Sequence, residues 1–201
     1  MCSQTQCWRR SCSPVGVNTP PLLGFCACSG TGKTTLLTQL LPLLKAKGLR
    51  IGMIKHAHHQ FDIDYPGKDS YELRKAGAQE MLVASRTRLA LIRETPEAQD
   101  EPTLPDLLKR LSLAELDLVL IEGFKWGDFP KIELHRPSLG QRLLHPDVSG
   151  VLAIATDAPL SNPPDLPQLD LNTPEAIADF VVQQFQIRAV SVSPKPELSQ
   201  E

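Results

Sequence analysis

The sequence is poor in aromatic residues and contains no long apolar segment. Phe, Trp and Tyr together make up 5% of its 201 residues, and no apolar run approaches the roughly 20 residues that cross a bilayer as a helix. Its 21 basic and 23 acidic residues leave a formal net charge of -2. The chain therefore also lacks the basic excess that is typical of nucleic-acid-binding proteins. Neither a membrane nor a nucleic acid is a predicted partner.

The cysteines do not form a recognisable framework. Their total is five, which is odd, and no apolar signal-peptide core precedes them. Cys2, Cys7 and Cys12 recur every five residues, which matches no common zinc-binding spacing. Cys26 and Cys28 alternate along an apolar segment and are expected to be small core residues. This pattern indicates a reducing compartment, and we predict the cytoplasm.

The length suits one α/β domain with tails. Residues 1–20 are polar, rich in Ser and Cys and without periodicity, and residues 189–201 lack apolar bulk. We expect these segments to be a disordered leader and a disordered tail. The predicted domain spans residues 21–188.

Apolar patterning within this domain predicts strands that alternate with helices, and hence a mostly parallel sheet with helices on both faces. The predicted strands are residues 22–28, 51–55, 81–84, 89–92, 116–121, 131–135 and 151–155. Strands 81–84 and 89–92 form an additional β-hairpin. A first helix is predicted over residues 33–47, with a kink at Pro42. A second, short helix is predicted where Asp69 and Glu72 form a capping pair and Gly77 ends the helix. A last helix is predicted from Thr173 onward. Residues 94–106 are acidic and are predicted to be a mobile loop.

A glycine-containing loop connects the first predicted strand to the first helix. Its backbone N–H groups and the helix N-terminus are suited to cradle phosphates, Lys33 supplies a charge to the β and γ oxygens, and the Thr34 hydroxyl can ligate magnesium. Ala27 stands where the phosphate-loop (P-loop) pattern has its first glycine. The fold class is therefore predicted to be of the P-loop NTPase type. The predicted phosphate-binding residues are Ser29, Gly30, Thr31, Gly32, Lys33, Thr34 and Thr35.

Two further strands are predicted to deliver acidic residues to the same sheet edge. Glu122 ends an apolar strand and is a candidate to hold magnesium, through water because of its length. Thr156 and Asp157 follow the strand at residues 151–155, and a carboxylate there can accept the N1–H and N2–H of guanine. An ordinary turn opening is the alternative for Asp157, so these residues favour guanine only slightly. No arginine is placed by the sequence as a catalytic finger.

The polar segment of residues 55–70 leaves several interpretations open. His56, His58 and His59, with two aspartates, could bind a metal, although adjacent histidines point apart on an extended chain. The segment could instead be a switch that senses the γ-phosphate, a cationic surface for an anionic ligand, or a solvated loop.

Several motifs occur in one order: GTGKTTLL at residues 30–37, IKHAHH at 54–59, PGKDS at 66–70, RKAGA at 74–78 and EGFK at 122–125. In this combination the chain resembles the MobB family of molybdopterin-guanine dinucleotide biosynthesis adapter proteins. The resemblance covers about residues 22–185. It implies GTP binding with Mg²⁺, slow GTP hydrolysis, a homodimer, and assistance to the molybdenum cofactor guanylyltransferase. Molybdopterin itself is a second candidate partner.

The resemblance also implies roles for single residues. Gly30 to Thr35 would bind phosphate, Thr34 and Glu122 would serve the metal, and Thr156 with Asp157 would take the guanine. Two other functions stay open beside a GTP-binding adapter, namely a small-molecule phosphotransferase and a metal-delivery GTPase that uses the histidines. A phosphotransferase would need a catalytic base, and the sequence presents no evident one.

Overall fold

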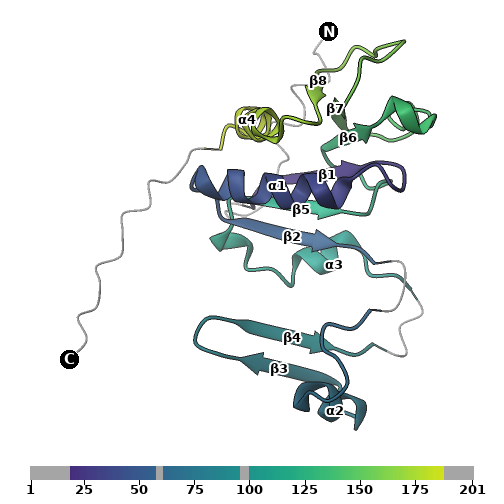
Figure 1. The fold of residues 1–201 in the computed structure, drawn as a ribbon. Coiled ribbons are helices and arrows are strands. Elements are labelled where there is room, and N and C mark those ends of the chain that lie inside the picture. The colour runs from purple at the N-terminus through teal and green to yellow at the C-terminus, as the bar shows by residue number, and fades with distance from the viewer. Residues whose placement is uncertain (1–18, 58–60, 96–99, 188–201) are drawn as a thin grey trace. The chain divides into compact units, whose positions relative to one another are not determined.

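The computed structural model describes residues 19–57, 61–95 and 100–187. The chain divides into two compact units, of which the larger comprises Met1–His56 and Leu104–Glu201 and the smaller comprises Ala57–Thr103 (Figure 1). Nearly all of the expected leader and all of the expected tail lie outside the described residues.

The larger unit is built on a six-stranded sheet whose paired strands are all parallel. The strand order is β2-β5-β1-β6-β7-β8. The strands are β1 (Leu22–Cys26), β2 (Ile51–Lys55), β5 (Leu118–Glu122), β6 (Lys131–His135), β7 (Val151–Thr156) and β8 (Gln168–Asp170). Strands β1, β5 and β7 are largely buried, which explains their nearly continuous apolar sequences.

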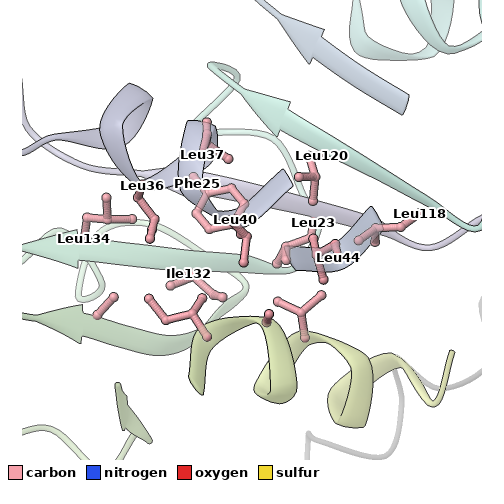
Figure 2. Packing of buried hydrophobic residues seen from close by; sticks show 14 of the residues in the cluster. Leu23, Phe25, Leu36, Leu37, Leu40, Leu44, Leu118, Leu120, Ile132 and Leu134 are labelled. Atoms are coloured by element: carbon pink, nitrogen blue, oxygen red, sulfur yellow. The ribbon is translucent and has the colours of Figure 1, made fainter. Parts of the chain in front are cut away.

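Two long helices cover one face of this sheet. Helix α1 (Lys33–Ala46) presents Leu36, Leu40 and Leu44, which recur at helical spacing and are at most 3% exposed. Helix α4 (Pro174–Phe185) adds Ile177 and Val181 to the same cluster. Figure 2 shows the leucines of α1 packed over Leu23, Phe25, Leu118, Leu120, Ile132 and Leu134 of the sheet. This packing fixes the N-terminus of α1 relative to β1.

The other face has a second apolar cluster and a polar stripe. Helix α3 (Leu104–Leu108) and the 3₁₀ turn η2 (Leu113–Glu115) pack leucines against Val119 and Ile121 of β5. On β6, Lys131 and Glu133 are each 1% exposed. Lys131 Nζ donates to the carbonyls of Gly127, Phe129 and Ser149, and burial lowers its pKa. Glu133 accepts the N–H groups of residues 144 and 145, so both charges are satisfied internally.

The smaller unit contains helix α2 (Asp69–Lys75) and a hairpin of β3 (Glu80–Ala84) and β4 (Leu89–Arg93). Arg74, whose side chain is 4% exposed, is its electrostatic centre. The guanidinium of Arg74 pairs with Asp62 at 2.8 Å and also with Asp64 and Glu94. The hydrogen bonds from Arg74 lower the pKa of Asp64, because they favour the carboxylate.

The predicted elements agree with this architecture, with some corrections. The sheet, the hairpin and helices α1, α2 and α4 are confirmed, and α1 continues through Pro42. Helix α2 begins after Lys68, and Glu72 reaches back to the N–H of Gly67 instead of forming a capping pair with Asp69. The segment predicted as an acidic loop ends in α3, and β8 was not predicted. No helix in the described part of the chain is long and apolar enough to span a membrane.

Candidate functional site

The predicted site residues of the larger unit meet at one edge of the sheet. The strands are parallel, so their carboxyl ends share this edge, where ligands of α/β proteins bind. Glu122 ends β5 and pairs in register with Phe25 of β1, just before the P-loop. On the other side of β1, β6 ends at His135, which pairs with Thr156 of β7. The P-loop therefore lies between Glu122 on one side and Asp157 on the other.

The P-loop leads into α1 through Gly32, which caps the helix in the left-handed conformation with φ of 99°. A residue with a Cβ is strained at such a φ. No side chain caps α1 within the described residues, and its first turn contains no acidic residue. The free N–H groups and the positive end of the helix dipole are therefore available to an anion. Ser29, Gly30, Thr34 and Thr35 are exposed at this end.

Internal hydrogen bonds shape the loop. Lys33 Nζ donates to the carbonyl of Ala27 at 3.3 Å and so bridges the two ends of the loop. The hydroxyl of Thr31, which is 2% exposed, donates to the carbonyl of Cys28 at 2.9 Å. Ala27 is not among the described residues with positive φ, and its methyl group packs against the core. A small residue with a side chain is thus tolerated where the P-loop pattern has glycine.

The carboxylate of Glu122 lies where it could hold a metal-bound water. Its side chain is 15% exposed, and Oε2 lies 3.5 Å from the ammonium of Lys55, which is 61% exposed. An exposed lysine can move away when a divalent cation takes over the neutralisation of the carboxylate. Gly123 follows with φ of 105° and abuts His56, whose ring stacks on Phe124 with centroids 4.6 Å apart. The contact fixes the chain that carries Glu122.

Asp157 forms a salt bridge with Arg136. Arg136 follows β6 directly, and its Nη1 bonds Asp157 Oδ2 while its Nε donates to the carbonyl of Thr31 at 2.9 Å. The hydroxyl of Thr156 donates to the carbonyl of Ala158 at 2.8 Å and thus shapes the turn. Sequence patterns alone indicate no arginine near the phosphates, whereas the structure brings Arg136 to the P-loop. Its position next to a strand end was the available signal.

The segment of residues 55–70 is only partly accounted for. His58 and His59 lie outside the described residues. Asp62 and Asp64, the two aspartates of the metal interpretation, are engaged by Arg74. Among the described residues, no group of three or more His, Cys, Asp or Glu side chains is arranged to hold a metal ion. Cys26 is equally inert, since burial raises the pKa of its thiol to about 12.

The chain matches a known protein family over most of its length. Residues 22–157 match the family model of MobB, described as molybdopterin guanine dinucleotide synthesis protein B. The chain belongs to the MobB family. The matched region contains the P-loop, Glu122, Arg136 and Asp157, and thus the whole sheet edge described above.

Individual relatives agree with this assignment. The chain is 51% identical over 167 residues to the molybdopterin-guanine dinucleotide biosynthesis adapter protein of Escherichia coli K12, covering 83% of this chain and 94% of that protein. The adapter protein of the same description from Haemophilus influenzae is 42% identical over 165 residues, with 82% and 89% covered. A crystal structure of MobB from Bacillus subtilis superposes with a TM-score of 0.64 at 27% identity, covering 82% of this chain and 97% of that one.

Proposed function

We propose that this protein binds GTP with Mg²⁺ at the sheet edge around its P-loop. The N–H groups of residues 30–35 would surround the phosphates, and Lys33 would release the Ala27 carbonyl to contact the β and γ oxygens. Thr34 and Glu122 would hold the metal, which neutralises phosphate charge when bound. Asp157, beside Thr156, would accept the guanine N–H groups.

One arrangement supports this proposal most directly. The uncapped N-terminus of α1 and the Lys33 ammonium are flanked by the Glu122 carboxylate on the β5 side and the Asp157 carboxylate on the β7 side. A nucleotide places its triphosphate between its metal and its base. The order of charges along the edge, acidic, basic and acidic, matches that ligand.

The biological role we infer is that of an adapter in molybdopterin-guanine dinucleotide biosynthesis. The relatives from E. coli and H. influenzae are adapter proteins of this pathway, and they are matched over most of their length. The protein would assist the guanylyltransferase that joins GMP to molybdopterin, with molybdopterin as a second candidate ligand. Hydrolysis would be slow, because unaided P-loop proteins turn over at about 10⁻⁴ to 10⁻² per second. The cysteine content supports the cytoplasm as its compartment.

A homodimer through the hairpin of the smaller unit is part of the proposal. Leu82 and Leu91 are cross-strand partners, and Leu89 shares their face of the hairpin. These three leucines are 58%, 51% and 67% exposed. A sheet of two strands is marginally stable alone and leaves backbone groups unpaired at its edges. A second copy of the hairpin offers the same apolar face and the same edges, and isologous contacts of this kind are the commonest route to a dimer.

Calorimetric titration of the full chain with Mg-GTP and Mg-ATP tests the nucleotide proposal. We expect saturable binding of one GTP per chain, weaker binding of ATP, and weaker binding of GTP when magnesium is chelated. Equal affinity for both nucleotides would contradict the role of Asp157. Rapid transfer of the γ-phosphate to a small acceptor would favour the phosphotransferase alternative.

A further inference from the structure

Arg136 occupies the space between the P-loop and the predicted base-reading residue. It is the first residue after β6, and β6 lies between β1 and β7 in the sheet. From this position its guanidinium reaches both neighbouring strand ends, with Nε on the Thr31 carbonyl and Nη1 on Asp157 Oδ2. The third nitrogen, Nη2, lies 3.7 Å from the point where a Cβ on Gly32 would stand. The side chain is 32% exposed, so solvent only partly competes for these bonds.

The two oxygens of Asp157 differ in their surroundings. Oδ2 is engaged by Arg136, whereas Oδ1 is buried and has no hydrogen-bond partner among the described residues. A buried carboxylate oxygen without a donor is unfavourable by itself, and a donor from a ligand would relieve this. The salt bridge therefore holds the carboxylate in one orientation, and the acceptor capacity of its buried Oδ1 stays unused among the described residues.

We propose that Arg136 is a positioning residue that fixes Asp157 relative to the P-loop and thereby determines selectivity for guanine. Discrimination by a carboxylate depends on where it stands relative to the base, and the base is placed by the phosphates to which it is joined. Arg136 donates one hydrogen bond to the P-loop, which would hold the phosphates, and another to the carboxylate of Asp157, which would read the base. It therefore sets the distance between the two subsites. This inference rests on the proposed GTP binding.

The geometry requires an arginine. The guanidinium is planar and rigid, so the hydrogen bonds from Nε and Nη1 point in two fixed directions, toward Thr31 and toward Asp157. A lysine has one flexible ammonium group and cannot hold both partners in a fixed relationship. Arg136→Lys therefore retains the charge near the loop but removes the coupling between the subsites.

The test compares affinities for Mg-GTP and Mg-ATP in the full-length protein and its variants. The variants are Arg136→Ala, Arg136→Lys, Asp157→Ala and the double variant of Arg136→Ala with Asp157→Ala. Arg142→Ala is the matched control, because Arg142 also pairs with an aspartate, Asp147, after β6 but is 77% exposed and bonds no P-loop residue in the described structure. Thermal melting of each variant checks that it is folded.

We expect Arg136→Ala to reduce the ratio of GTP to ATP affinity by about tenfold or more, since a charge-assisted hydrogen bond contributes on this scale. Arg136→Lys should also reduce the ratio while losing less affinity for both nucleotides. In the Asp157→Ala background, removing Arg136 should leave the ratio unchanged, because Arg136 acts through Asp157. Arg142→Ala should behave like the wild type.

Two results would overturn the inference. If Arg136→Ala and Arg136→Lys weakened GTP and ATP equally, Arg136 would serve the P-loop alone. If removing Arg136 changed the ratio as much without Asp157 as with it, the base would be read independently of this pair. A wild-type protein that binds neither nucleotide, or binds both equally, would contradict the proposed function itself, and this outcome is seen before any variant is made.

Discussion

The ammonium group of Lys33 lies 3.3 Å from the carbonyl oxygen of Ala27, at the opposite end of the loop that both residues belong to. In this position the lysine holds the loop closed with a single, partly exposed hydrogen bond. A phosphate oxygen offers the ammonium a charged partner in place of the neutral carbonyl, and charge-assisted hydrogen bonds are roughly twice as strong. We therefore propose that the side chain changes partner when a triphosphate binds.

Lys33→Ala should abolish tight GTP binding with little loss of fold stability. Within the described residues the lysine side chain contributes one partly buried hydrogen bond, for which we expect a cost of at most about 1 kcal/mol. Its loss from the ligand should weaken GTP by about 100-fold or more, since a charged contact to phosphate disappears. Calorimetry with Mg-GTP, together with thermal melting, measures both effects. Unchanged affinity would refute the phosphate assignment.

Gly123→Ala should destabilise the larger unit at the strand end that carries Glu122. The backbone of Gly123 has φ of 105°, and an added Cβ would stand 2.6 Å from the Cβ of His56. Backbone strain and overlap together should cost about 2 kcal/mol or more. Gly140→Ala is the control, because Gly140 also has positive φ, of 62°, but among the described residues other than its chain neighbours no atom lies within 4 Å of the added Cβ. Equal loss of stability in urea unfolding would contradict the close contact.

The salt bridge between Arg50 and Asp117 predicts a stability change with pH. Arg50 donates to both carboxylate oxygens of Asp117 at 2.9 and 3.0 Å and lowers its pKa. The ionised pair stabilises the fold at pH values above the unfolded-state pKa of about 3.9. This stabilisation is lost as the pH falls through the lowered pKa of the folded state. Asp117→Asn should therefore be less stable than wild type by a constant amount at pH 5 to 8, and this difference should close below about pH 4. A difference that persists in unfolding experiments at pH 2 would be inconsistent with the ionised pair.

Leu82→Lys should convert the predicted dimer to a monomer. The substitution places a charge on the leucine face of the hairpin, which we propose is buried against a second copy. Val83→Lys is the matched control, since Val83 is the next residue of β3, is 45% exposed and points to the opposite face. Light scattering at micromolar concentration should give a dimer mass for the wild type and Val83→Lys only. A monomeric wild type would exclude this interface.

The sequence predicted most of the sheet because β1, β5 and β7 are nearly continuous apolar runs, and the leucine spacing of α1 is equally clear. Strand β8 has three residues, of which only Leu169 is apolar, so its pairing with β7 leaves little sequence signal. Helix α3 was not predicted, because the acidic residues before it indicated a loop. Its leucines are partly buried against β5, a contact that only the tertiary fold reveals.

The candidate site was predictable where it depends on local sequence and not where it depends on neighbouring strands. The P-loop and Glu122 follow directly from short motifs. Asp157 could be placed at the correct edge, yet its partner Arg136 lies 21 residues away in the chain. The contact follows from the order β1-β6-β7, and a single sequence does not reveal which strands are neighbours. The ion pairs of Arg74 with Asp62 and Asp64 were missed for another reason, because a sequence does not show how the loop before α2 folds back onto that helix.

We propose that this protein acts as a GTP-dependent adapter for guanine dinucleotide formation. The most direct measurement is the rate at which purified guanylyltransferase converts molybdopterin and Mg-GTP to molybdopterin-guanine dinucleotide, with and without this protein. We predict that the wild-type protein raises the rate and that Lys33→Ala, at equal concentration, does not. A wild-type protein that leaves the rate unchanged would contradict the adapter role, and full stimulation by Lys33→Ala would contradict its dependence on bound GTP.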